Sequence, residues 1–269
     1  MRPGPGVVGI RVRFVAMLVA VSALSLTLTS CSGSKPTAGP VGTDDRGPAI
    51  TYVAVGASES VGFGTDDPIR QAWPAVLYRT LPRRAAYVNL GIPGATVDEA
   101  LTTEVPQALA LHPTLVTVWL NVNDITSLVP AATYEQQLGE LVHQLRNGGA
   151  TRVLVANTPP VDHLPAYLAC QPDAPSGLPP CVLGGLGQLL VPGPDTINAT
   201  VDAYNQAVVR VVAEEAAVLV DLHALGLHAR AQGKEAELVG TDGFHPSVAG
   251  HQAVADAFAA ALRTAGGAG

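Results

Sequence analysis

An Asp and a His stand three residues apart in the stretch "GTDGFHPSVAGH", residues 240–251. A helix-like run, "SVAGHQAVADAFAAAL", follows directly, so the polar pair could simply form a capped helix start. The alternative is chemical. His245 can act as a base, and Asp242 can hold the imidazole in one tautomer and stabilise its positive charge. That interpretation requires a nucleophile elsewhere in the chain.

The elements that would position such a nucleophile are strands and helices in alternation. Continuous apolar runs are typical of strands covered on both faces, and they are separated by helix-like segments. This alternation predicts a parallel sheet between two helical layers, a doubly wound α/β/α sandwich. The expected strands are 49–56, 85–91, 114–121, 152–158 and 217–222, and the expected helices between them are 68–81, 96–111, 133–149 and 198–216.

Ligands of doubly wound sheets bind at the carboxyl ends of the strands, so the residues after each strand are informative. Ser58 follows the first strand in "GASES", Gly94 follows the second in "NLGIPGAT", and Asn123 follows the third in "NVND". A serine hydroxyl needs a base to become a good nucleophile. The backbone N–H groups of Ser58 and Gly94 and the side-chain amide of Asn123 could stabilise an oxyanion. Each of these residues alone could be a turn or cap residue. Because all of them fall at the carboxyl edge of the predicted sheet, together they predict one site.

These blocks resemble those of the SGNH (GDSL-type) hydrolases, in which Ser, Gly, Asn and His occur in this order. The resemblance covers about residues 49–265. It implies a flavodoxin-like, three-layer α/β/α sandwich with a mostly five-stranded parallel sheet. It also implies a carboxylic ester hydrolase with Ser58 as nucleophile, His245 as base, Asp242 as the acid that orients it, and an oxyanion hole at Ser58, Gly94 and Asn123. The resemblance implies no metal and no organic cofactor.

Two positions depart from the family pattern. Ala57 replaces the Asp of Gly-Asp-Ser, and Asn121 replaces the Gly of Gly-x-Asn-Asp. Neither position supplies one of the reacting groups, so the departures bear on substrate range and activity level. An α/β-hydrolase is the alternative enzyme class, but its Gly-x-Ser-x-Gly elbow would need a Gly where Ser60 stands. Its acid and His also normally come from separate loops.

The amino-terminal segment has the features of an export signal. Arg2, Arg11 and Arg13 precede an apolar region of 15 residues, 14–28, which is too short to span a bilayer. It ends in "LTSC", which resembles a bacterial lipobox and implies cleavage before Cys31 and lipidation of its sulfur. The alternative is an ordinary signal peptide with a chance Cys. We therefore expect a signal peptide at 1–30, a flexible tether at 31–48 and the hydrolase domain at 49–266.

The net charge and the expected export limit the classes of partner that this protein could bind. Removal of residues 1–30 leaves 12 of the 15 basic residues and all 22 acidic ones, a net charge of −10, with no basic stripe. Nucleic acid is therefore a poor partner. We expect a monomer, exported to the cell envelope and anchored on the outer face of the cytoplasmic membrane. Its expected partner is a small-molecule, lipid or glycan ester.

Residues 159–197 form a long Pro/Gly-rich insertion without a clear element, and loops of this length are usually functional or disordered. Cys170 and Cys181 lie inside it, and two cysteines in an exported chain favour a disulfide over free thiols. We therefore expect an ordered loop near the site rather than a mobile surface insertion. His223, His228 and His251 lack the spacing of metal ligands, so core or surface histidines are the better interpretation.

Together these observations predict a lipid-anchored serine esterase or lipase that works through an acyl-serine intermediate. Two alternatives remain. An acyltransferase could use the same site with a sugar or lipid hydroxyl in place of water. A catalytically silent envelope-binding lipoprotein is the alternative outside enzymes, and the departures at Ala57 and Asn121 keep it open.

Overall fold

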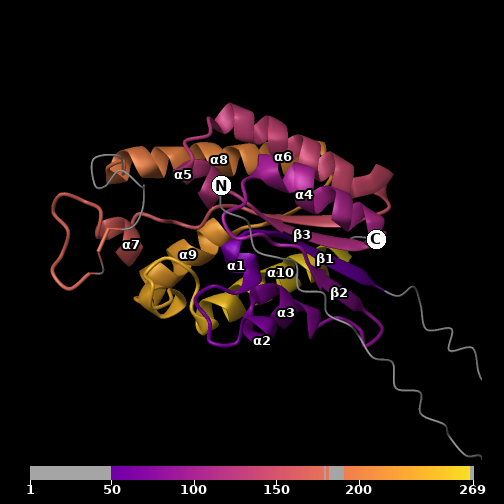
Figure 1. The fold of residues 1–269 in the computed structure, drawn as a ribbon, viewed down its shortest axis with the longest axis horizontal. Helices are drawn as coiled ribbons and strands as arrows, with labels where there is room; N and C mark the ends of the chain where they lie inside the picture. Colours follow the sequence, from indigo (N-terminus) through magenta and orange to yellow (C-terminus); the bar gives the residue numbers. More distant parts are fainter. Residues whose placement is uncertain (1–49, 179, 182–190, 267–269) are drawn as a thin grey trace, which may run out of the picture. The chain divides into compact units, whose positions relative to one another are not determined.

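The computed structural model describes residues 50–178, 180–181 and 191–266 (Figure 1). The expected signal peptide, the expected lipidation site at Cys31 and the tether lie outside the described residues. No helix in the described part of the chain is long and apolar enough to cross a membrane.

A five-stranded, fully parallel sheet forms the centre of the domain. Its strands run in the order β2-β1-β3-β4-β5. The order reverses between β1 and β3, which is the kind of switch point where doubly wound sheets bind ligands. The five expected strands and the three-layer sandwich are therefore confirmed. The strands are β1 (Thr51–Gly56), β2 (Ala86–Asn89), β3 (Leu115–Trp119), β4 (Arg152–Ala156) and β5 (Val218–Val220).

Two helical layers cover the sheet, as Figure 1 shows. One layer is α4 (Val97–Ala110), α6 (Ala131–Arg146) and α8 (Pro194–Glu214), whose buried side chains pack on Val53, Val55 and their neighbours. The other is α3 (Trp73–Tyr78), α9 (Leu222–Ala231) and α10 (Val248–Gly266), which pack on the opposite side chains of the same strands. Burial on both faces explains why the central strands β1, β3 and β4 read as continuous apolar runs.

Short helices occupy several connections at the carboxyl edge of the sheet. They matter because two of them carry predicted site residues at their first turns. These short helices are α1 (Ser58–Val61), α2 (Pro68–Gln71), α5 (Val122–Thr126) and α7 (Pro165–Leu168). Two 3-10 turns also occur, η3 (Glu235–Leu238) and, at the amino end of β4, η1 (Asn147–Gly149).

Several expected helix boundaries were wrong, and prolines explain two of the differences. The helix expected at 68–81 is divided at Ala72, whose backbone is extended, because Pro74 has no N–H and its ring would meet the carbonyl of Arg70 in a continuous helix. The segment 159–197 contains α7 and the start of α8, which begins with Pro194 at a helix position that suits proline.

The long segment is tied to the rest of the domain. The expected disulfide between Cys170 and Cys181 is present. Just before it, the N–H of Ala166 donates to the carbonyl of Gly243, 3.0 Å away, on the loop that carries Asp242 and His245. The described beginning of the insertion therefore lies beside the predicted site.

Candidate active site

The turn after β1 presents Ser58. The strand ends at Gly56, and Ser58 opens α1 with only 8% of its surface exposed. A side chain at position 56 would collide with Ser60, since an added Cβ would lie 2.1 Å from its Oγ. A glycine at this position therefore lets α1 fold back closely over the end of the strand.

Ser58, His245 and Asp242 form one continuous line of hydrogen bonds. The Ser58 Oγ lies 2.8 Å from Nε2 of His245, and Nδ1 of His245 lies 2.6 Å from Oδ2 of Asp242. The other oxygen of Asp242 accepts the backbone N–H groups of Phe244 and His245 at 2.9 and 3.0 Å. Burial opposes ionisation of Asp242, but these hydrogen bonds outweigh it and lower the pKa of its carboxyl.

The two remaining predicted residues are linked through a loop. Gly94 has a φ of 86°, a left-handed conformation that favours glycine, and it is exposed. The side-chain amide of Asn123, in the first turn of α5, donates to the carbonyl of Ala95 at 2.9 Å. The structure therefore brings Asn123 together with the loop that carries Gly94.

Asp124 forms hydrogen bonds at the point where the loop that carries Gly94 leads into α4. Its two carboxylate oxygens accept the N–H of Val97, the first residue of α4, at 3.1 and 3.3 Å. The side chain is fully buried, and burial raises the pKa of this carboxyl to about 6 despite the hydrogen bond. A capping box between Thr96 and Glu99 completes the helix start.

His245 lies between aromatic rings, and a second histidine lies behind it. The rings of Phe63 and Phe244 are centred 5.2 and 5.0 Å from the His245 ring. His251 is fully buried; its Nε2 lies 2.9 Å from the carbonyl of Phe63, and its Nδ1 accepts the N–H of Trp73 at 3.2 Å. Burial lowers the pKa of His251, so it supports the loop as a neutral ring.

The two departures from the family pattern are both buried. Ala57 is 1% exposed, and Asn121 is 2% exposed with its amide nitrogen 3.5 Å from the carbonyl of Ala156. Over the described ranges, no group of three or more His, Cys, Asp or Glu residues is arranged to hold a metal ion.

The sequence did not point to two glutamates near Ser58, the predicted nucleophile. Glu104, fully buried on α4, accepts the N–H of Gly56 at 2.9 Å, and burial raises the pKa of its carboxyl to about 8. Its position was detectable, because it shares a helical face with Val97, Ala100 and Ala108, all buried. Glu59 follows Ser58 directly, and its Oε2 lies 3.4 Å from the Ser58 Oγ.

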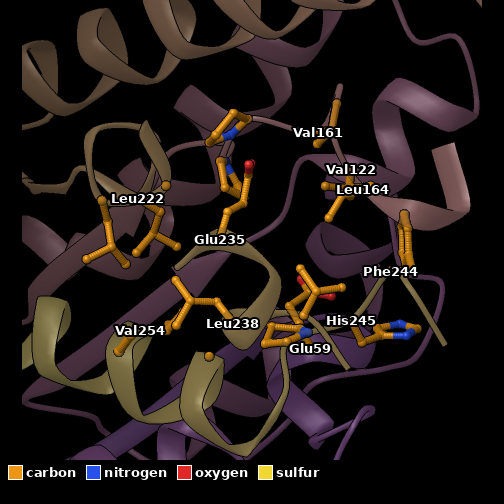
Figure 2. Close-up of a pocket in the computed structure, with 18 of the residues that line it drawn as sticks. Glu59, Val122, Val161, Leu164, Leu222, Glu235, Leu238, Phe244, His245 and Val254 are labelled. Atoms are coloured by element: carbon orange, nitrogen blue, oxygen red, sulfur yellow. The ribbon is translucent and has the colours of Figure 1, made fainter. Parts of the chain in front are cut away.

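An apolar pocket of about 120 Å³ opens beside His245 (Figure 2). Figure 2 shows Glu59 and His245 toward one end of it, with apolar side chains from α9, α10 and the start of the insertion around the rest. Such a pocket beside a serine, a base and possible oxyanion donors is the arrangement that ester hydrolysis requires.

Comparison with known proteins agrees with this arrangement. The GDSL-like Lipase/Acylhydrolase family matches residues 54–253, which is most of the chain. The chain therefore belongs to this family, and it is a serine ester hydrolase. No curated protein sequence matches it.

Solved structures share the fold. TesA superposes with a TM-score of 0.58 at 22% identity, covering 80% of this chain and 98% of its own. The lipase/acylhydrolase from Enterococcus faecalis gives 0.57 at 17% identity, covering 78% and 93%. The psychrotrophic esterase EstA from Pseudoalteromonas sp. gives 0.55 at 15% identity, covering 80% and 97%.

Proposed function

We propose that this protein is an exported, lipid-anchored esterase that cleaves carboxylic esters through an acyl-Ser58 intermediate. The observation that carries the esterase part of the proposal is the unbroken line of hydrogen bonds from Asp242 through His245 to Ser58. Residues 187 positions apart in the sequence meet there at hydrogen-bond distance, which is the geometry that activates a serine. Export and anchoring are supported by the signal-like sequence that ends at Cys31.

The reaction follows from these contacts. Ser58 Oγ attacks the ester carbonyl while Nε2 of His245 takes its proton, and Asp242 stabilises the imidazolium that forms. The oxyanion is stabilised by the N–H groups of Ser58 and Gly94 and by the amide of Asn123, once that amide turns from the carbonyl of Ala95. His245 then protonates the departing alcohol, and water repeats the cycle to release the acid.

Labelling with a fluorophosphonate tests this proposal, since such probes react with activated serines. EstA from Pseudoalteromonas sp. is described as inhibited by monoethylphosphonate, which supports the choice of probe. We expect the wild type to label and to hydrolyse p-nitrophenyl esters, and Ser58→Ala and His245→Ala to lose both properties. The matched controls are Ser127→Ala and His228→Ala, which change exposed residues.

The outcome also separates the alternatives. If the folded wild type does not label, the alternative of a catalytically silent envelope-binding lipoprotein is favoured. The departures from the family motif at Ala57 and Asn121 would then be the first candidates for the loss of activity. An acyltransferase would label equally well. It would be recognised by transfer of the acyl group to an added sugar or lipid alcohol in preference to water.

A further inference from the structure

The pocket beside His245 is within reach of the alcohol part of an ester. His245 must deliver its proton to the departing alcohol oxygen, so that oxygen has to lie against Nε2 of this ring. Because His245 lines the pocket, the alcohol part of an ester can extend into it while the departing oxygen faces this ring. The oxyanion donors Gly94 and Asn123 are not among its lining residues.

The lining of this pocket is apolar except for very few groups. Two carboxylates line it, those of Glu59 and Glu235. Glu235 already has a cationic partner, Arg230 at 2.8 Å, and Nδ1 of His163 lies 3.2 Å from its other carboxylate oxygen. Among the described residues, no Lys or Arg forms a salt bridge with Glu59, whose polar contacts are with Ser58 and nearby backbone.

A half-buried carboxylate without a cation is costly in such surroundings. Burial raises the pKa of Glu59 to about 7, so the free pocket holds it partly protonated. A bound cation would relieve this cost, whereas a purely apolar occupant would not.

We propose that the pocket binds esters whose alcohol part carries an ammonium group, with the Glu59 carboxylate as its counter-ion. This rests on the proposed esterase function and specifies its substrate class. Trp119 and Phe244 line the same pocket, and aromatic faces attract alkylated ammonium groups. The volume of about 120 Å³ is several times the roughly 15 Å³ that one water needs, so a small branched cation can enter.

The test compares two butyrate esters that differ in charge and little in shape, the choline ester and the 3,3-dimethylbutyl ester. We expect the wild type to have a kcat/KM about tenfold higher for the choline ester, the scale of one desolvated cation–carboxylate or cation–aromatic contact. Glu59→Gln and Glu59→Leu should bring that ratio close to one. Glu237→Gln, which removes an exposed charge outside the pocket, should keep the wild-type ratio.

A second measurement needs no variant. Tetramethylammonium chloride should inhibit the wild type competitively, and sodium chloride at the same ionic strength should not. The proposal is overturned by a wild-type ratio of one or less, by a ratio that survives Glu59→Gln, or by absence of this competition.

Failure here is distinguishable from failure of the proposed function. If fluorophosphonate labelling and turnover of the neutral ester persist while the cationic preference is absent, only the substrate class is wrong. If labelling of a folded wild type is absent, the esterase proposal itself fails.

Discussion

Asp242 performs two tasks with its two oxygens. Oδ2 receives Nδ1 of the His245 ring, and Oδ1 receives the backbone N–H groups of Phe244 and His245. The same carboxylate therefore orients the imidazole and shapes the loop that carries it. This arrangement fits the close spacing of the Asp and the His in the sequence, because a short loop can satisfy both contacts at once.

Asp242→Asn should reduce kcat/KM for p-nitrophenyl esters by roughly 10³–10⁴. An Asn side chain can present its NH₂ group to Nδ1 of His245, which places the ring proton on Nε2. A protonated Nε2 cannot accept the proton of Ser58. Steady-state kinetics at neutral pH provides the measurement, and Asp66→Asn, an exposed site, is the control for charge. A loss of less than tenfold would show that His245 does not depend on Asp242.

Glu104 makes a residue-scale prediction about pH. Its pKa in the folded chain, about 8, lies above its ordinary value of 4.5. The stability that the neutral carboxyl contributes is therefore complete below the ordinary pKa and is lost as pH rises through about 8. Glu104→Gln should remove this loss, which amounts to at most about 1.4 kcal/mol per pH unit between those values.

Urea unfolding at about pH 5, 7 and 9 measures this difference. Glu104→Leu is the informative companion variant, because it leaves the N–H of Gly56 without its acceptor and should be about 1–3 kcal/mol less stable than Glu104→Gln at every pH. A parallel pH dependence in wild type and Glu104→Gln would show that Glu104 ionises normally.

At the scale of elements, α4 and α5 are joined through one carboxylate. Asp124 on α5 accepts the first N–H of α4, and the loop between β2 and α4 carries Gly94 toward Asn123. The hydrogen bond between Asp124 and Val97 therefore helps to position the two predicted oxyanion donors, the side-chain amide of Asn123 and the backbone N–H of Gly94.

Asp124→Ala should lower the free energy of unfolding by about 1–3 kcal/mol, because the buried N–H of Val97 loses its acceptor. The melting temperature should fall by several degrees, and kcat should fall with it as the Gly94 loop loosens. Asp124→Asn keeps an acceptor oxygen and should recover most of both properties. Asp202→Ala, at an exposed site, should change neither, and an equal effect there would contradict the argument.

The elements that could be predicted are those whose signal is local. All five strands were found because each lies in an apolar run, including the partly buried edge strands β2 and β5, the latter with only three residues. Breaks and start points of helices were harder to predict from the sequence. The break at Ala72 depends on Pro74, which a helical period alone does not weigh, and the start of α8 depends on Pro194 at its first position.

The residues of the candidate site also fall into those with a local sequence signal and those whose role depends on packing. Ser58, Asp242 and His245 were predictable because strand ends and a short motif point to them. Glu59 and Glu104 were missed because their importance lies in burial beside the nucleophile, which depends on how α1 and α4 pack against β1. Only the apolar face of α4 carried a sequence signal, and it concerned burial rather than chemistry.

At the scale of the whole molecule, the site and the entry of the chain lie at opposite ends of one strand. The described chain enters β1 at Thr51, and Ser58 follows its other end, so about 20 Å of extended strand separates them. The expected lipidation site, Cys31, precedes Thr51 by 20 residues in the sequence.

Cys31→Ala tests the expected lipid anchor. Each buried methylene of a lipid chain contributes about 0.8 kcal/mol to membrane binding, so two acyl chains on one sulfur suffice for stable association. We expect the wild type to sediment with membranes and to incorporate labelled palmitate, and the variant to lose the label. Ester turnover per labelled active site should stay unchanged, because the anchor contributes nothing to the Ser58 chemistry. A variant that still incorporates palmitate would show that Cys31 is not the lipidated residue.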